Sequence, residues 1–160
     1  MRDQVFVAVI GSATADAEIT ALAEEVGREI ARHGAILVCG GRGGVMEAAC
    51  RGARSADGTT VGILPGTDRR EANAYVDIPV VTGMGEARNA IVVRSADAVI
   101  AVSGGYGTLS ELGLALKMGR PVVGLRTWEL YREGQPTGAF LEADTPTQAV
   151  QLALGRRRPA

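Results

Sequence analysis

The sequence contains little of what several common kinds of site require. Its 160 residues include one histidine, two cysteines and only 4% aromatic residues. Cys39 and Cys50 form no C-x-x-C pair and have no companion histidines at the spacing of metal ligands, so neither a metal site nor a required cofactor is predicted. Cysteine usage of this kind also favours a reduced, cytoplasmic protein. His33 follows the first predicted helix, where a structural role is expected.

Neither the charge nor the apolar runs indicate a nucleic acid or membrane partner. Seventeen basic residues stand against 18 acidic ones, for a formal net charge of −1. The arginine run at 156–158 is expected to be a solvated tail, with partner binding as the alternative. The apolar part of the N-terminus, residues 5–10, is too short for a signal peptide, and no run has membrane-spanning length. We therefore expect a soluble, cytoplasmic protein.

Three familiar catalytic or nucleotide-binding motifs are also missing. The absence of G-x-x-x-x-G-K-[ST] excludes hydrolysis of the P-loop kind. The absence of G-x-S-x-G, together with a single histidine, excludes a hydrolase triad. Residues 41–46 nearly match G-x-G-x-x-G, but Met46 occupies the third glycine position and the turn follows the second predicted strand. A dinucleotide-dependent oxidoreductase is therefore disfavoured.

Apolar runs and helical patterns alternate along the whole chain. The composition is 46% hydrophobic, and 160 residues can bury the core of one domain, which we expect to span 1–160. Strands are predicted at 5–10, 36–39, 61–64, 78–81, 98–102 and 121–125, and helices at 16–32, 45–50, 85–95, 108–118 and 145–154. The apolar runs are continuous, which is typical of parallel strands covered on both faces. The predicted fold is α/β, a Rossmann-like, three-layer, doubly wound parallel sheet.

The most informative segment follows the predicted strand at 98–102. Ser103 begins a glycine-rich turn that opens a helix, so backbone N–H groups and the positive end of the helix dipole are expected to face one point. Glycines allow close approach because a Cβ would hold an anion away from the backbone. We predict a phosphate cradle, and its members are Gly104, Gly105, Tyr106, Gly107 and Thr108.

Three further turns end other predicted strands. In a doubly wound sheet, ligands bind beyond the carboxyl ends of the strands, near the point where the strand order reverses. We therefore expect one shared pocket, with the turn at 40–44 approaching a ring or ribose and the other two turns walling the pocket. The residues predicted in these turns are Gly11, Ser12, Gly40, Gly41, Gly43, Gly44, Pro65 and Gly66.

Glu111 and Arg88 are the charged groups predicted for this pocket. Glu111 lies one turn into the helix after the cradle, within reach of a sugar or ring, although Thr108 and Glu111 also match a purely structural capping box. In the predicted helix 85–95, Arg88 shares an apolar face with Met84 and Ile91, where a guanidinium would contact a phosphate or carboxylate. The alternative is an arginine that extends to solvent or pairs with a structural carboxylate.

Together these motifs resemble the Lonely Guy and molybdenum cofactor carrier group of Rossmann-like proteins, many of which were formerly described as lysine decarboxylases. The resemblance rests on the turn at 40–46, the pair Arg88-Asn89 and the G-G-x-G-T-x-x-E segment at 104–111. It implies a phosphorylated small molecule as partner, either the molybdenum cofactor or a nucleoside monophosphate. It also implies a homo-oligomer, a dimer or a tetramer.

Two departures separate this chain from the enzymes of the group. Lonely Guy enzymes cleave the N-glycosidic bond of nucleoside 5′-monophosphates and carry P-G-G-x-G-T-x-x-E with an upstream Arg-Lys pair. Here Ser103 replaces the proline and Asn89 replaces the lysine. The chain is more similar to the carrier-like branch, which implies binding of a nucleotide-like or pterin-like ligand without chemistry.

Two other functions stay open at the level of sequence. In a phosphoribohydrolase, Glu111 would stabilise the cationic sugar of the transition state and Arg88 would anchor the substrate, so these two would be the catalytic residues. A regulatory or scaffold module that binds no ligand is the third alternative, because a fold does not imply a function.

Overall fold

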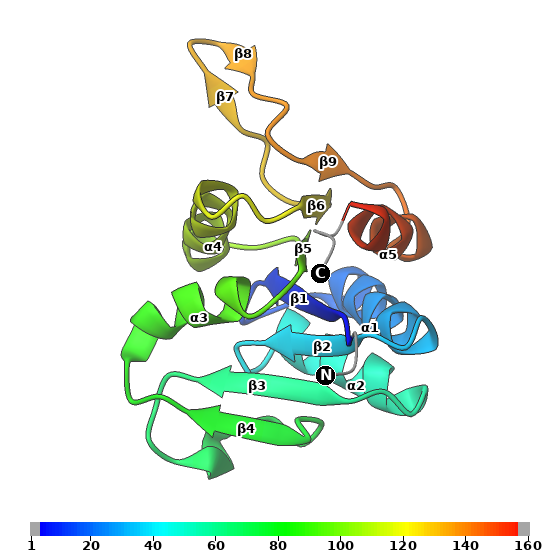
Figure 1. Ribbon diagram of the computed structural model, residues 1–160, viewed down its shortest axis with the longest axis vertical. Helices are drawn as coiled ribbons and strands as arrows, with labels where there is room; N and C mark the ends of the chain where they lie inside the picture. The colour runs from blue at the N-terminus through cyan, green and yellow to red at the C-terminus, as the bar shows by residue number, and fades with distance from the viewer. Residues whose placement is uncertain (1–3, 157–160) are drawn as a thin grey trace.

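Seven parallel strands run through the centre of the computed structural model, which describes residues 4–156 (Figure 1). Their order across the sheet is β4-β3-β2-β1-β5-β6-β9, and every neighbouring pair is parallel. The strands are β1 (Phe6–Gly11), β2 (Ile36–Cys39), β3 (Thr60–Leu64), β4 (Ile78–Val81), β5 (Ala98–Val102), β6 (Val122–Leu125) and β9 (Leu141–Glu142). The central strand β5 is fully buried, as its unbroken apolar sequence predicts.

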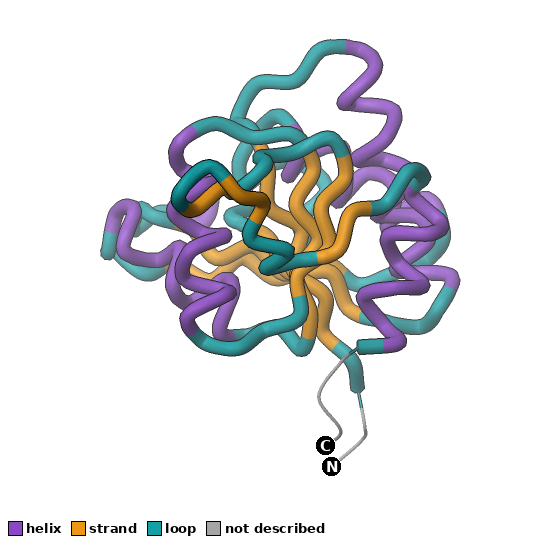
Figure 2. Tube along the Cα trace, turned by 90° about the horizontal axis from the view of Figure 1, so that it is seen from above, coloured by secondary structure: helices purple, strands orange, loops and turns teal. Residues whose placement is uncertain are grey.

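Five α-helices cover the two faces of the sheet, and Figure 2 shows the strands enclosed between them. One face carries α1 (Ala17–Arg32), α2 (Val45–Ser55) and α5 (Pro146–Gly155), and the other carries α3 (Asn89–Arg94) and α4 (Tyr106–Lys117). The predicted three-layer, doubly wound α/β fold is confirmed. Within residues 4–156, no helix is both long and apolar enough to cross a membrane.

Helix ends follow signals that are present in the sequence. The Asp16 carboxylate caps α1 by accepting the N–H of Ile19 at 2.8 Å. His33 lies at the C-terminal end of α1 with its Nδ1 2.8 Å from the Glu29 carbonyl oxygen, which fits the structural role expected for it. Thr145 caps α5, which has proline at its first position. Residues 1–3, and Arg157 and Arg158 of the terminal arginine run, lie outside the described residues.

Two glycines bring α1 and α2 into backbone contact. A Cβ on Gly27 would overlap the carbonyl group of Ala49, and one on Gly52 would overlap that of Glu24. Because side chains do not separate the two helices here, α2 is held close against α1. This contact fixes the position of the first turn of α2, and therefore of the glycine turn at 40–44 that precedes it.

The strand order reverses between β1 and β5. These strands pair in register from Val7 and Ala98 to Gly11 and Val102. The chain continues from β1 to β4 on one side and from β5 to β9 on the other. Gly11 lies at the point of divergence, where a Cβ would be 2.5 Å from the Val102 carbonyl oxygen and 2.6 Å from Val45 Cγ1. The reversal leaves a crevice at the carboxyl edge of the sheet, as expected for this fold.

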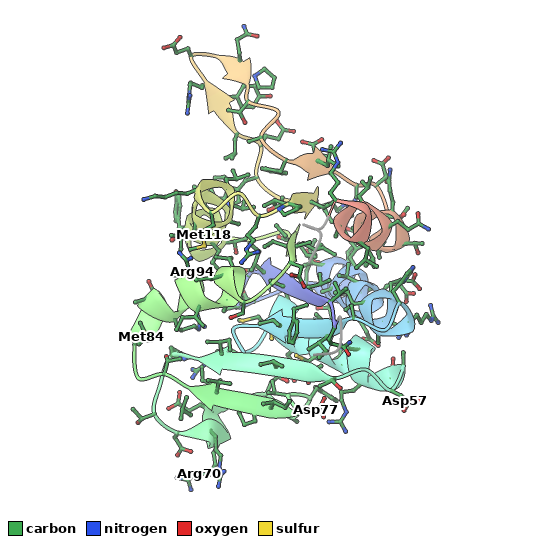
Figure 3. All side chains as sticks on the ribbon, in the orientation of Figure 1. Asp57, Arg70, Asp77, Met84, Arg94 and Met118 are labelled. Atoms are coloured by element: carbon green, nitrogen blue, oxygen red, sulfur yellow. The ribbon has the colours of Figure 1, made fainter. Side chains whose placement is uncertain are left out.

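The prediction of one continuous helix over 85–95 was wrong. The segment is a 3-10 turn, η2 (Gly85–Arg88), followed by the short α3. Gly83 and Gly85 both have positive φ angles, 63° and 58°, which an α-helix does not accept. Met84 therefore does not share a buried stripe with Arg88; it is 50% exposed at the outer end of the segment (Figure 3).

The connection after β6 contains strands that the sequence did not predict. β7 (Tyr131–Arg132) and β8 (Gln135–Pro136) pair as an antiparallel hairpin that extends away from the sheet in Figure 1. Its turn residues Glu133 and Gly134 have φ angles of 51° and 76°, typical of a two-residue hairpin turn. Strands of two residues are too short to show an alternating pattern. A second 3-10 turn, η1 (Arg69–Glu71), lies in the predicted surface loop at 67–73.

Candidate functional site

A cavity of about 380 Å³ lies at the point where the strand order reverses. Segments that follow β1, β2, β3, β4 and β5 all contribute to its wall, so it is the shared pocket expected at this edge of the sheet. Its lining includes, from the predicted set, Gly11, Ser12, Pro65, Arg88, Gly105, Gly107, Thr108 and Glu111. Larger hollows of about 480 and 490 Å³ border the β7–β8 hairpin, but they are lined mostly by one connection and not by several strand ends.

The other predicted residues lie behind or beside the cavity. Gly40 backs the Arg88 guanidinium, because a Cβ there would be 2.8 Å from Arg88 Nη2 and 2.8 Å from Met46 Sδ. The Tyr106 ring is 83% exposed and lies against Trp128, with 5.7 Å between ring centroids. The remaining predicted glycines contact neighbouring turns or side chains, and these are Gly41, Gly43, Gly44, Gly66 and Gly104.

The N-terminus of α4 points its backbone donors at this cavity. The helix begins at Tyr106 with Gly105 as its N-cap, and no side chain caps it. Thr108 is therefore inside the first turn, and the capping-box alternative for Thr108 and Glu111 was wrong. Among residues 4–156, no protein acceptor receives a hydrogen bond from the backbone N–H groups of residues 104–108. Free amides at the positive end of a 12-residue helix form an anion-binding arrangement.

The backbone at the start of the cradle explains one departure from the enzyme motif. Ser103 has a φ of 53° and Gly104 a φ of 120°. Proline is restricted to a φ near −65°, so the proline of P-G-G-x-G-T does not fit the conformation found here. The cradle of this chain therefore begins with a left-handed residue, which accounts physically for the absence of proline at position 103.

Glu111 is a buried carboxyl group on the wall of the cavity. Its exposed fraction is 8%, and no side-chain hydrogen bond or ion pair to it occurs in the described part of the chain. Burial raises the pKa of Glu111 to about 7, and the positive charge of Arg88 opposes this increase only in part. The carboxyl group is therefore neutral in a large fraction of molecules near neutral pH, and it can then donate a hydrogen bond.

Arg88 and Asn89 contribute polar atoms that the protein leaves unpaired. The Arg88 guanidinium is half-buried, and its closest polar contact is Nη2 donating to the Gly40 carbonyl oxygen at 3.4 Å. Arg88 Nε and Asn89 Oδ1 are buried and have no hydrogen-bond partner within residues 4–156. Burial lowers the pKa of Arg88, because desolvation disfavours its charge. Neither alternative for Arg88, full extension to solvent or a structural carboxylate within 4 Å, occurs among the described side chains.

Several residues of the wall were not predicted. Arg42 lies within the recognised glycine turn and contributes to the rim of the cavity, where its Nη1 is 2.8 Å from Glu71 Oε2. Its place inside that turn was the available signal. Glu86 also lines the cavity, and the wrong helical assignment of 85–95 concealed it. Ala13, Met46 and Asn89 complete the lining.

Comparison with known proteins agrees with this geometry. A model of the SLOG cluster4 family matches residues 4–150. The chain belongs to the SLOG cluster4 family. A relative from Archaeoglobus fulgidus named "Uncharacterized protein" is 48% identical over 148 residues, which cover 92% of this chain and 93% of the relative.

Solved structures and a curated enzyme extend the picture of this SLOG cluster4 protein. The molybdenum cofactor binding protein of Rippkaea orientalis superimposes with a TM-score of 0.83 at 38% identity, covering 97% of this chain and 98% of that one. The molybdenum cofactor carrier protein of Chlamydomonas reinhardtii gives 0.82 at 38% identity, covering 96% and 99%.

A phosphoribohydrolase is related over a shorter stretch. The cytokinin riboside 5′-monophosphate phosphoribohydrolase of Mycobacterium tuberculosis is 40% identical over 99 residues, which cover 60% of this chain and 53% of the enzyme. The resemblance to the Lonely Guy and molybdenum cofactor carrier group is thus confirmed, and the carrier proteins match over nearly the whole chain.

The buried Glu111 carboxyl group predicts a specific dependence of stability on pH. Because its pKa is about 7 in the folded protein and near 4.5 when exposed, the folded state binds the proton more tightly between these values. Stability from this group is full below pH 4.5 and is lost as pH rises through 7. Relative to Glu111→Gln, which does not titrate, the wild type should lose about 3 kcal/mol of unfolding free energy from pH 4.5 to 8. Urea denaturation of both proteins measures this difference, and a difference that is constant with pH would contradict the assignment.

Proposed function

We propose that this SLOG cluster4 protein binds a phosphorylated nucleotide-like or pterin-like molecule, with the phosphate at the N-terminus of α4. The observation that carries the proposal is the convergence of two kinds of unpaired donor on one cavity. Backbone N–H groups of Gly105, Gly107 and Thr108 approach from one side, and the half-buried guanidinium of Arg88 lies in the same wall. A phosphate accepts hydrogen bonds from both kinds of donor.

The rest of the cavity suits the organic part of such a ligand. Met46 and Pro65 offer apolar contact, while Asn89 and the neutral form of Glu111 offer hydrogen bonds to ring nitrogens or hydroxyl groups. Its volume of about 380 Å³ is in the usual range for small-molecule sites. The names of the two carrier proteins that match nearly the whole chain support the molybdenum cofactor as a candidate cargo.

Homo-oligomerisation, implied by the resemblance, stays a prediction. Exposed apolar side chains lie along the edge strand β4 and in the turn after it, and they are Ile78, Val80, Val81 and Met84. Such a patch is a candidate surface for a second copy. Light scattering of the purified protein tests the expected dimer or tetramer, and a monomeric mass would contradict it.

Phosphoribohydrolase activity is the second candidate function. It is favoured by the position of Glu111, which lines the same cavity as Arg88, and by the activity named for the Mycobacterium tuberculosis relative. A carboxylate there would stabilise an oxocarbenium-like sugar. Asn89 in place of the lysine, and a Glu111 pKa near 7 that leaves much of the group uncharged, both weaken this candidate. We therefore favour binding over hydrolysis.

The role of Arg88 is tested by binding of AMP and adenosine, which differ only in the phosphate. Calorimetry should show that the wild type binds AMP more tightly than adenosine. Arg88→Ala should lower the affinity for AMP at least tenfold, because a charged hydrogen bond contributes roughly 1.5–3 kcal/mol. The matched control is Arg94→Ala, which removes an exposed arginine of the same helical segment (Figure 3) and should leave the affinity unchanged. Equal affinities for AMP and adenosine would overturn the proposal.

Turnover separates the two candidate functions. On incubation of the protein with AMP, chromatography should show no free adenine and no ribose 5-phosphate above the level of a protein-free sample. Release of both products by the wild type, lost in Glu111→Ala, would instead support the phosphoribohydrolase. Release that persists in Glu111→Ala would point to a contaminating enzyme and leave binding as the favoured function.

A further inference from the structure

Two side chains outside the cavity hold the carbonyl groups of the cradle. Thr127 Oγ1 donates a hydrogen bond to the Ser103 carbonyl oxygen at 2.6 Å, and Trp128 Nε1 donates to the Gly105 carbonyl oxygen at 3.1 Å. Both residues follow β6, the neighbour of β5 in the sheet. Neither residue lines the cavity, so any effect on a ligand there must act through the backbone of residues 103–106.

These two bonds determine where the N–H groups of the cradle point. In a planar trans peptide group, the carbonyl and the N–H of the next residue point in opposite directions. Holding the Ser103 carbonyl toward Thr127 therefore directs the Gly104 N–H away from Thr127. In the same way, Trp128 holds the Gly105 carbonyl and directs the Tyr106 N–H away from the indole.

The cradle backbone needs this external support because its conformation is not the one its residues prefer. Ser103 has a left-handed φ of 53°, a region that costs a residue with a Cβ about 1–2 kcal/mol. The two donors are themselves held by packing. The Thr127 methyl group lies close to Gly124, where a Cβ would be 2.8 Å from it, and the Trp128 ring contacts Tyr106.

We infer that Thr127 and Trp128 are positioning residues for phosphate: by fixing the Ser103 and Gly105 carbonyl groups, they aim the cradle N–H groups and give the site its preference for phosphorylated ligands. This inference rests on the proposed function. It separates phosphate recognition, which depends on these two side chains, from contacts to the rest of the ligand, which do not.

Three variants test this separation, with AMP and adenosine as probes in calorimetry. Thr127→Val removes the hydroxyl at nearly constant shape, Thr127→Ser keeps the hydroxyl, and Trp128→Phe keeps the ring but removes the indole N–H. Thr127→Val and Trp128→Phe should each weaken AMP binding about threefold to tenfold, as expected for one hydrogen bond. Adenosine binding should stay within about twofold, and Thr127→Ser should bind AMP like the wild type.

A control elsewhere in the fold distinguishes positioning from general destabilisation. Thr60 Oγ1 donates to the Tyr75 carbonyl oxygen at 2.6 Å at the start of β3, the opposite edge of the sheet. Thr60→Val should lower the melting temperature without changing AMP affinity. Unchanged AMP binding in Thr127→Val and Trp128→Phe, or parallel losses for AMP and adenosine, would overturn the inference alone. A wild type that binds AMP no better than adenosine would overturn the proposed function and this inference together.

Discussion

Strands β1 and β5 pair in parallel up to Gly11 and Val102, and the chain then leaves them on opposite sides of the sheet. The approach is so close that Gly11 has no room for a side chain between the Val102 carbonyl group and Val45. Because the two segments diverge from adjacent points, neither fills the space in front of the other. The cavity at this position and the N-terminus of α4 beside it both depend on this contact.

The charges at the cavity are arranged to accept an anion and not to neutralise themselves. Glu111 is the one fully buried carboxyl group in its wall, and burial favours its neutral form. Arg88, also desolvated, meets only a weakly bound carbonyl oxygen. An arriving phosphate would meet a guanidinium and a set of backbone amides, and its negative charge would favour protonation of Glu111 further. Protonation of Glu111 would allow a carboxyl group and a phosphate to occupy one site.

Much of this could be read from the sequence because it depends on local pattern. The strands at 36–39, 78–81 and 98–102 have the predicted bounds, and the glycine turn before α4 lies where a parallel sheet gathers its ligands. The start of α4 was misplaced because Gly105 and Gly107 have low helix propensity, which made Thr108 the natural cap. The surface position of Met84 follows from the positive φ angles of Gly83 and Gly85, which periodicity does not reveal.

The contacts of Thr127 and Trp128 belong to another class. They join residues 23 and 24 positions apart through the pairing of β5 and β6, so no local pattern could have indicated them. The most direct test of the whole account is a crystal structure at saturating inorganic phosphate. The account predicts an anion within hydrogen-bond distance of the N–H groups of Gly105, Gly107 and Thr108 and of the Arg88 guanidinium. Amides that instead bond to the protein's own atoms, with no anion at the start of α4, would contradict it.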